Sequence, residues 1–265
     1  MGTESRNPNS MNLSELSALE IVRLMNQEDA AVLTAVGECV ERIAEASQCY
    51  SETLRNGGRV FYLGAGTSGG LALIDAAEVP PTFGLSDDKV IALTAEDGIY
   101  YTTNDEDDPD KAERQLREHN LTSNDFVIGL AASGSTPYVL HGLKYATSIG
   151  AKTASVACNK NSLIGQVADI AIEADTGPEV LTGSTRLKAG TAEKMILNML
   201  STSAMVSLGK VVSNFMVDVK PMNEKLQKRA KSIIIQITGC GEAEAEAALR
   251  QCNDSVSQAI RLIQG

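Results

Sequence analysis

The chain has 265 residues, 43% of them hydrophobic, and a formal net charge of −11. A chain of this size can bury one large core, and its negative charge disfavours nucleic acid and acidic membrane surfaces as partners. No apolar run approaches the roughly 18 residues that cross a bilayer, and the polar first ten residues hold no secretory hydrophobic region. We therefore expect a soluble protein of the cytoplasm.

The cysteines and histidines narrow the chemistry further. The five cysteines are scattered without any C-x-x-C pair, which favours reduced, mostly buried thiols over a zinc site or a disulfide framework. With only two histidines, a histidine-rich metal site or a Ser-His-Asp triad is not expected. We predict that the protein uses neither a metal nor an organic cofactor.

Two helices are predicted at the start of the chain. Apolar residues recur at three-residue steps from Leu13 to Met25, and after Asp29 helical spacing continues from Val32 to about residue 54. Gly57-Gly58 is expected to end the second helix.

Five short apolar runs then alternate with helical stretches. Their continuous apolarity is typical of strands covered on both faces, as in a parallel sheet with helices on each side. The sequence therefore predicts an α/β fold, a three-layer αβα sandwich around a five-stranded parallel sheet. The predicted strands are residues 60–63, 90–94, 126–130, 153–157 and 170–172.

The remaining segments are helical. Residues 187–212 are apolar nearly all round, which indicates a helix buried at the centre of the molecule or in a subunit interface. Three short helices are predicted at residues 225–237, 242–251 and 255–263. We expect two domains: residues 1–220, with the sheet and the N-terminal helices, and residues 221–265, a small helical bundle.

Two small-residue loops follow strands at corresponding places of a faint internal repeat. Residues 64–69 read GAGTSG and match G-x-G-x-x-G, with Glu96 as a possible ribose-binding acid. However, Glu96 lies further on than the usual ~20 residues, and dinucleotide loops do not need the hydroxyls of Thr67 and Ser68. In the second loop, residues 133–137, Thr136 is a good N-cap and Pro137 a good first helical residue.

Each loop alone could be an ordinary tight turn between a strand and a helix. Together they favour a binding site at the carboxyl ends of parallel strands. Hydroxyl groups and the free amides of a helix N-terminus suit a phosphate monoester. The sequence therefore predicts a site for a phosphorylated small molecule.

Longer motifs carry a resemblance to a known family. Residues 75–84 read DAAEVPPTFG, residues 131–139 read AASGSTPYV, and residues 177–191 read GPEVLTGSTRLKAGT. With the 64–69 loop, they resemble the N-acetylmuramic acid 6-phosphate etherases over nearly the whole chain. The resemblance implies a sugar-isomerase (SIS) fold, usually dimeric, and a role in amino-sugar metabolism during peptidoglycan recycling.

The resemblance also implies a reaction: cleavage of the D-lactyl ether of N-acetylmuramic acid 6-phosphate by elimination and then addition of water. It assigns Glu78 as the acid toward the leaving lactate and Glu106 as the base at C2. An acidic run such as residues 104–108 is often only a solvated loop, so which of its carboxylates is the base stays open. The expected phosphosugar-binding residues are Gly66, Thr67, Ser68, Ser133, Ser135, Thr136, Glu179 and Lys188.

Departures from the family pattern leave other functions open: two missing arginines and a rebuilt stretch between Thr94 and Glu106. The family has an arginine where this chain has Gly70, and another where it has Ser135. Their loss motivates a non-catalytic sugar-phosphate sensor as the alternative. An aldose–ketose isomerase of the same fold would also deprotonate C2, but it would not need an acid at Glu78. Lys188 and Arg186 remain as candidate cations, although both could lie in a solvated first turn of the long helix.

Overall fold

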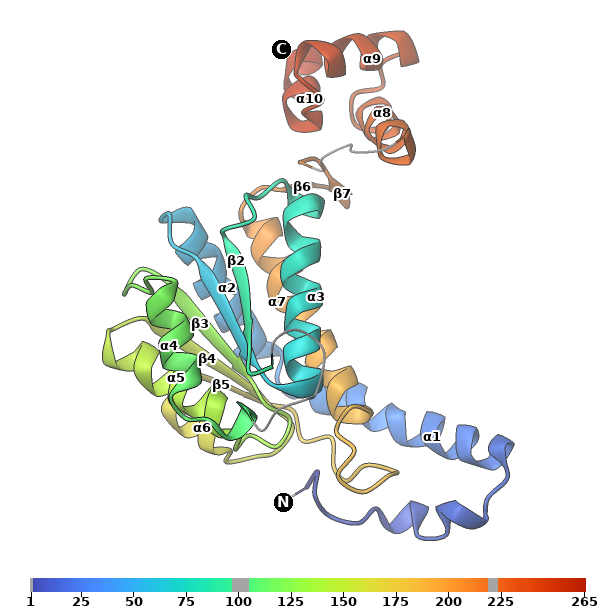
Figure 1. Cartoon of the computed structure of the whole chain (residues 1–265). Helices are drawn as coiled ribbons and strands as arrows, with labels where there is room; N and C mark the ends of the chain where they lie inside the picture. The colour runs from blue at the N-terminus through green and yellow to red at the C-terminus, as the bar shows by residue number, and fades with distance from the viewer. Residues whose placement is uncertain (1, 97–104, 219–223) are drawn as a thin grey trace.

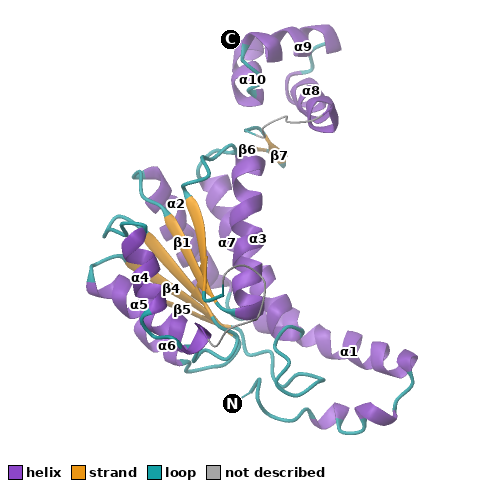
Figure 2. Ribbon diagram, viewed as in Figure 1, coloured by secondary structure: helices purple, strands orange, loops and turns teal. Residues whose placement is uncertain are grey.

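The computed structural model describes residues 2–96, 105–218 and 224–265. Its centre is a five-stranded, wholly parallel sheet with strand order β2-β1-β3-β4-β5 (Figure 2). Each predicted strand is confirmed to within one residue at either end. The strands are β1 (Val60–Gly64), β2 (Val90–Thr94), β3 (Phe126–Leu130), β4 (Lys152–Ala157) and β5 (Ile170–Glu173).

Helices cover both faces of the sheet, which confirms the three-layer αβα architecture (Figure 1). One face packs against α2, α3 and α7, with α1 packed on α7, and the other face packs against α4, α5 and α6. Each face has its own apolar cluster. The helices are α1 (Ala18–Gly37), α2 (Val40–Arg55), α3 (Gly66–Phe83), α4 (Lys111–Glu118), α5 (Pro137–Ser148), α6 (Leu163–Val167) and α7 (Lys188–Ser207).

The N-terminal helices are divided differently from the prediction. Two short 3-10 helices, η1 (Pro8–Ser10) and η2 (Leu13–Glu15), come first. Ser17 then starts α1 with a capping box that includes Glu20, and α1 runs through Asp29 to Gly37. The expected break after Asp29 was wrong, because the chain has no helix-breaking residue there and the turn falls at residues 38–39.

Helix α3 also runs further than expected. Two consecutive prolines ordinarily end a helix, yet α3 continues through Pro80 and Pro81 to Phe83 and stops at Gly84, whose φ is 68°. Two prolines in the last turn lose only their own N–H bonds, while the carbonyl of Pro80 still accepts from Gly84 N at 2.9 Å. The helix therefore ends at the glycine, which adopts the left-handed conformation at low cost.

Helix α7 confirms the predicted buried helix. It packs against α1, α2 and α3, and eleven of its residues are buried, among them Ile196, Leu197 and Leu200. A short hairpin that the sequence did not predict follows it, β6 (Val211–Val212) and β7 (Phe215–Met216).

The C-terminal helices form a separate apolar cluster. They are α8 (Glu224–Thr238), α9 (Glu242–Gln251) and α10 (Val256–Gln264), and Val217 next to the hairpin packs with them. Ser257 N donates to Val217 O at 2.9 Å. The predicted bundle lies at the end of the molecule opposite α1 (Figure 1). Its predicted boundary, between residues 220 and 221, lies outside the described residues, so the division into two domains stays a prediction.

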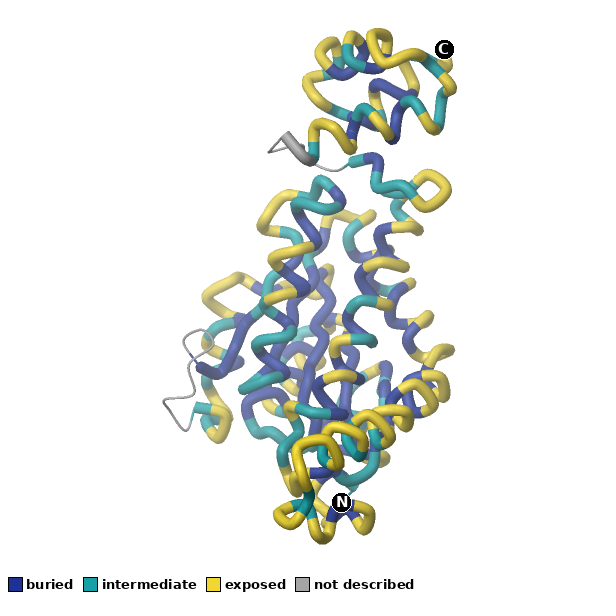
Figure 3. Tube along the Cα trace, turned by 90° about the vertical axis from the view of Figure 1, so that its right-hand side faces the viewer, coloured by how far each residue is buried: buried dark blue, intermediate teal, exposed yellow. Residues whose placement is uncertain are grey.

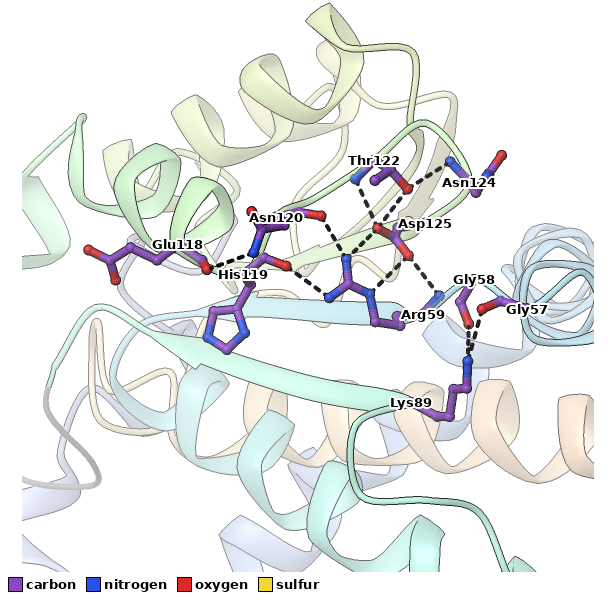
Figure 4. Close-up of polar contacts among 10 residues, drawn as sticks. All are labelled: Gly57, Gly58, Arg59, Lys89, Glu118, His119, Asn120, Thr122, Asn124 and Asp125. Carbon is purple, nitrogen blue, oxygen red and sulfur yellow. Dashed lines mark hydrogen bonds and ion pairs between the residues drawn. The ribbon is translucent and has the colours of Figure 1, made fainter.

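A polar clasp fixes the amino ends of the central strands (Figure 4). The guanidinium of Arg59 binds both carboxylate oxygens of Asp125, at 3.2 and 2.8 Å, and also donates to the carbonyls of His119 and Asn120. Asp125 in turn accepts from the backbone amides of Arg59 and Thr122. The clasp precedes β1 and β3, whereas the two small-residue loops follow them. It therefore lies at the opposite end of these strands from the loops.

Candidate functional site

The two small-residue loops meet in one pocket of about 320 Å³. They follow β1 and β3, which are neighbouring strands with Gly64 paired to Leu130, so their carboxyl ends lie side by side. The structure thus brings six of the predicted ligand residues together with Glu106. The pocket is lined by Glu4, Ala65, Gly66, Thr67, Ser68, Glu106, Asp107, Ala131, Ala132, Ser133, Ser135, Thr136, Pro137 and Thr185.

Close packing shapes the first loop. A Cβ added to Gly64 would lie 2.7 Å from the amide nitrogen of Gly69, so only glycine allows the helix to start so near the strand. Within this loop, the amide of Gly66 donates to both carboxylate oxygens of Glu96, at 3.2 and 3.1 Å. One amide at the N-terminus of α3 is therefore already hydrogen-bonded to a carboxylate of the protein itself.

The second loop presents hydroxyl groups. Gly134 has a φ of 74°, and a Cβ there would lie 2.3 Å from the Cβ of Ser162. The Oγ atoms of Ser133 and Ser135 are 3.2 Å apart, and Ser135 N donates to Ser133 Oγ at 3.3 Å. Thr136 is the N-cap of α5, but its side chain makes no capping bond among the described residues. Its hydroxyl is thus available to a ligand.

Acidic side chains lie on another part of the pocket wall. Glu106 and Asp107 come from the 3-10 helix η3 (Asp105–Asp107), and Glu4 comes from the N-terminal segment. Partial burial, then the charges of Asp107 and Glu96, raise the pKa of Glu106 above its ordinary value. No lysine, arginine or histidine is among the described residues that line the pocket.

The structure does not bring Glu78 into this pocket. It is exposed, and it lies twelve residues after Gly66 on α3. At 1.5 Å per residue, this places it roughly 18 Å along the helix axis from the loop. Glu78 forms no hydrogen bond or ion pair with any residue that the structure describes.

Glu179 and Lys188 also lie outside the pocket lining. The carboxylate of Glu179 accepts from the amides of Lys188 and Ala189, both at 3.0 Å, and so caps the N-terminus of α7. The ammonium of Lys188 is buried and lies 3.0 Å from Glu28 on α1. A buried ammonium needs an anionic partner, and here the chain supplies its own. Arg186, the other candidate cation, is exposed.

Sequence reasoning missed one residue behind the pocket. Glu193 on α7 is completely buried, and both of its carboxylate oxygens are 2.9 Å from Ser68 Oγ. A glutamate within a stretch that is apolar on nearly all sides was the available signal. It also missed Glu4 and Thr185, although Thr185 belongs to the 177–191 motif. Glu96 was weighed only as a ribose ligand.

The described part of the chain has neither a metal-binding cluster nor a membrane-spanning helix. No group of three or more histidine, cysteine, aspartate or glutamate side chains among those residues could hold a metal ion. Within the same residues, no helix is long and apolar enough to span a membrane.

Comparisons with known structures agree on the fold. A family model described as the SIS domain matches residues 26–158. A phosphoheptose isomerase from Francisella tularensis superposes with a TM-score of 0.57 over 72% of this chain and all of that one, at 15% identity. The Vibrio vulnificus NanR protein, complexed with ManNAc-6P, gives a TM-score of 0.54 at 15% identity over 75% of this chain and 66% of that one. At such low identities the likeness concerns the fold alone.

Sequence relatives are far more similar. The N-acetylmuramic acid 6-phosphate etherase of Actinobacillus pleuropneumoniae serotype 7 is 47% identical over 99% of this chain and 88% of its own length. N-acetylmuramic acid 6-phosphate etherase 2 of Enterococcus faecalis is 49% identical over 98% of this chain and 89% of its own length. Matches of this length span both loops, the 75–84 motif and the 177–191 motif. The chain belongs to the N-acetylmuramic acid 6-phosphate etherase family.

Proposed function

We propose that the protein cleaves the D-lactyl ether of N-acetylmuramic acid 6-phosphate and releases N-acetylglucosamine 6-phosphate and D-lactate. Membership of the etherase family, at 47 to 49% identity over nearly the whole chain, carries this proposal. A pocket of about 320 Å³ that combines a hydroxyl-lined loop with a carboxylate supports it. The scattered, free cysteines agree with a cytoplasmic enzyme.

The phosphate binds at the second loop. There, Ser133, Ser135 and Thr136 offer hydroxyl groups at the N-terminus of α5, where the helix dipole favours a negative charge. The N-terminus of α3 is less suitable, because the carboxylate of Glu96 already accepts from Gly66 N. Thr67 and Ser68 then face the sugar or its phosphate from the opposite wall.

Glu106 acts as the base. In the open-chain aldehyde, the C2 proton is acidic because it is α to the carbonyl, and Glu106 removes it. The C3–O bond then breaks, the ether oxygen takes a proton from an acid, and a C2=C3 alkene remains. Water adds back, with its hydroxyl at C3 and a proton at C2. A raised pKa makes Glu106 a stronger base than an ordinary glutamate.

Glu78 serves as the acid across a subunit interface. It is too far along α3 to share one sugar with the phosphate loop of its own chain. Ile74, one turn before Glu78, is 62% exposed, and α3 packs against α7. An apolar groove on α7 includes Met195 and Met199. We propose that a second copy of the chain covers this surface and that the partner subunit's Glu78 completes each pocket.

Helix α1 gives a second reason to expect a homodimer. Its first buried residue is Val32, so most of its length is exposed or half-buried (Figure 3). The helix projects from the rest of the molecule (Figure 1). Leu19, Val22 and Leu33 are 58%, 63% and 67% exposed. Apolar side chains gathered along one projecting helix are typical of a protein–protein interface.

Mixing inactive variants tests both the reaction and the composite site. Glu78→Gln and Glu106→Gln should each release almost no D-lactate. If each site combines Glu106 of one subunit with Glu78 of the other, a heterodimer of the two variants has one intact site of two. A randomly reassociated equimolar mixture, in which about half of the dimers are heterodimers, should then regain about one quarter of the wild-type activity. No recovery in verified heterodimers would place both residues in one chain. A folded wild type that releases no D-lactate would exclude the etherase activity.

A sugar-phosphate sensor remains the second candidate, because no cation is among the described lining residues while three carboxylates are. Such a sensor would bind N-acetylglucosamine 6-phosphate without exchanging its C2 proton in deuterated water. Exchange that Glu106→Gln abolishes would favour the enzyme. An isomerase would instead keep its full activity in Glu78→Gln.

A further inference from the structure

A single buried carboxyl lies directly behind the pocket. Glu193 is completely buried on α7, and both of its oxygens are 2.9 Å from Ser68 Oγ. Among the residues that the structure describes, Ser68 is its only hydrogen-bonding partner, and no cation pairs with it. Ser68 is one of the residues that line the pocket, so Glu193 is bonded to a member of the pocket wall.

The protonation state of Glu193 decides which way the Ser68 hydroxyl points. An ionised carboxylate only accepts, so Ser68 must direct its hydrogen toward α7 and present lone pairs to the pocket. A protonated carboxyl donates to Ser68 Oγ, and the hydroxyl hydrogen is then free to point into the pocket. Only the second arrangement offers a donor to an anionic ligand.

Burial favours the protonated form. It raises the pKa of Glu193 to about 8, and the hydrogen bond from Ser68 only partly opposes this. At neutral pH, Glu193 is therefore mainly uncharged. Other titratable groups lie on the elements packed around α7, and most of them bond to partners other than Glu193. Tyr62 on β1 donates to Asp75 on α3, Lys188 pairs with Glu28 on α1, and Glu179 after β5 caps α7. Tyr50 on α2 and Cys158 after β4 are buried.

We propose that Glu193 is a positioning residue whose protonated carboxyl turns the Ser68 hydroxyl toward a bound sugar phosphate, and whose ionisation weakens binding. This inference rests on the proposed phosphosugar site. It extends that site to a group that never touches the ligand. It also implies linkage: a phosphate dianion in the pocket disfavours a second negative charge behind Ser68, so binding near pH 8 takes up protons.

Calorimetry with N-acetylglucosamine 6-phosphate tests the inference without requiring catalysis. Titrations in buffers of different ionisation enthalpy report the protons taken up. On binding at pH 8, wild type should take up about half a proton per site at most. Its Kd should rise about tenfold from pH 7 to pH 9. In Glu193→Gln, an isosteric change that keeps a donor and an acceptor, the uptake should vanish and the Kd should stay flat. Ser68→Ala should lose the same pH dependence.

Asp75→Asn provides a matched control. Asp75 is also a buried carboxyl between α3 and α7, and it accepts from Ser201 much as Glu193 accepts from Ser68. Because Ser201 does not line the pocket, Asp75→Asn should keep the wild-type proton uptake. Equal uptake by wild type and folded Glu193→Gln would overturn the inference and leave the phosphosugar site intact. Wild type that binds no sugar phosphate at any pH would overturn both. Normal proton-linked binding without D-lactate release would overturn only the proposed reaction.

Discussion

The backbone amide of Gly66 donates to both carboxylate oxygens of Glu96, at 3.2 and 3.1 Å. A helix N-terminus next to a strand end is a favourable place for a phosphate, and here a protein carboxylate takes it. Glu96 thereby makes the two similar loops unequal. The N-terminus of α3 is capped from within, whereas the hydroxyl groups before α5 face the pocket.

Glu96→Gln should therefore improve substrate binding and shift the pH profile. The amide oxygen still accepts from Gly66 N, but a negative charge near an anionic ligand is lost, so KM should fall severalfold. Glu96 is also one of the charges that raise the pKa of Glu106, so the acidic limb of kcat against pH should move to lower pH. Steady-state D-lactate release from pH 4.5 to 8 measures both. An unchanged acidic limb would show that Glu96 and the base do not interact.

Glu106→Gln should block chemistry and spare binding. Loss of a general base typically costs about 10²- to 10⁴-fold in rate, and Gln keeps the size of the side chain. We expect kcat to fall in that range while the Kd for N-acetylglucosamine 6-phosphate stays within a factor of about three. Asp107→Asn, at the adjacent position on the pocket wall, is the control for the acidic run. If Asp107→Asn abolished C2 deuterium exchange and Glu106→Gln did not, the base would be Asp107.

Periodicity and loop composition predicted the sheet and the convergence of the two loops, because both follow from local patterns. Strands buried on both faces have continuous apolar runs, and the carboxyl ends of neighbouring parallel strands share one edge. The loop residues could thus be placed together without knowing the strand order. The end of α3 could not be predicted from such local patterns. The effect of Pro80 and Pro81 depends on their position within the last turn of the helix.

The partners of buried charged side chains also could not be predicted from the sequence. Lys188 was predicted to meet the ligand, but it lies 3.0 Å from Glu28, 160 residues earlier in the chain. Glu179 caps α7 through two backbone amides. A family motif identifies such residues as important, but only the packing of α1 against α7 shows whether a charge points to a ligand or to another side chain. Segment 97–104, where the sequence departs from the family pattern, lies outside the described residues.

The clasp between Arg59 and Asp125 should contribute strongly to stability. The side chain of Asp125 is 2% exposed, so Asp125→Ala would leave the Arg59 guanidinium without its buried partner. Removing one member of a buried pair typically costs about 3–5 kcal/mol, which urea unfolding would detect as a lower midpoint. Arg42→Ala, in the exposed Arg42–Glu45 pair, is the control and should leave the midpoint unchanged. Equal midpoints for Asp125→Ala and wild type would mean that the clasp does not contribute to stability.

Acid should weaken the same clasp. Burial alone would raise the pKa of Asp125, but the hydrogen bonds from Arg59 and two backbone amides outweigh it and lower the pKa below 3.8. The stabilisation is therefore present above the unfolded pKa and is lost as pH falls through the folded value. The difference in unfolding free energy between wild type and Asp125→Ala should be constant from pH 5 to 7 and shrink below pH 4. A difference that persisted at pH 2 would mean that packing, not charge, holds these strands.

Glu193→Gln should make the protein more stable at neutral pH, with a dependence opposite to that of Asp125. The pKa of Glu193 rises from 4.5 to about 8 on folding, so the unfolded chain releases a proton that the folded protein keeps. Wild-type stability therefore falls as pH rises from about 4.5 to 8, whereas the glutamine variant lacks this loss. At about 1.4 kcal/mol per pKa unit, and allowing for relaxation around the charge, the variant should gain roughly 2 to 4 kcal/mol on wild type between pH 5 and 8. Urea midpoints at both pH values measure the gain. Identical pH dependence in the two proteins would mean that Glu193 already ionises in the folded state near its ordinary pKa, and the carboxyl behind Ser68 would then be charged whenever the substrate binds.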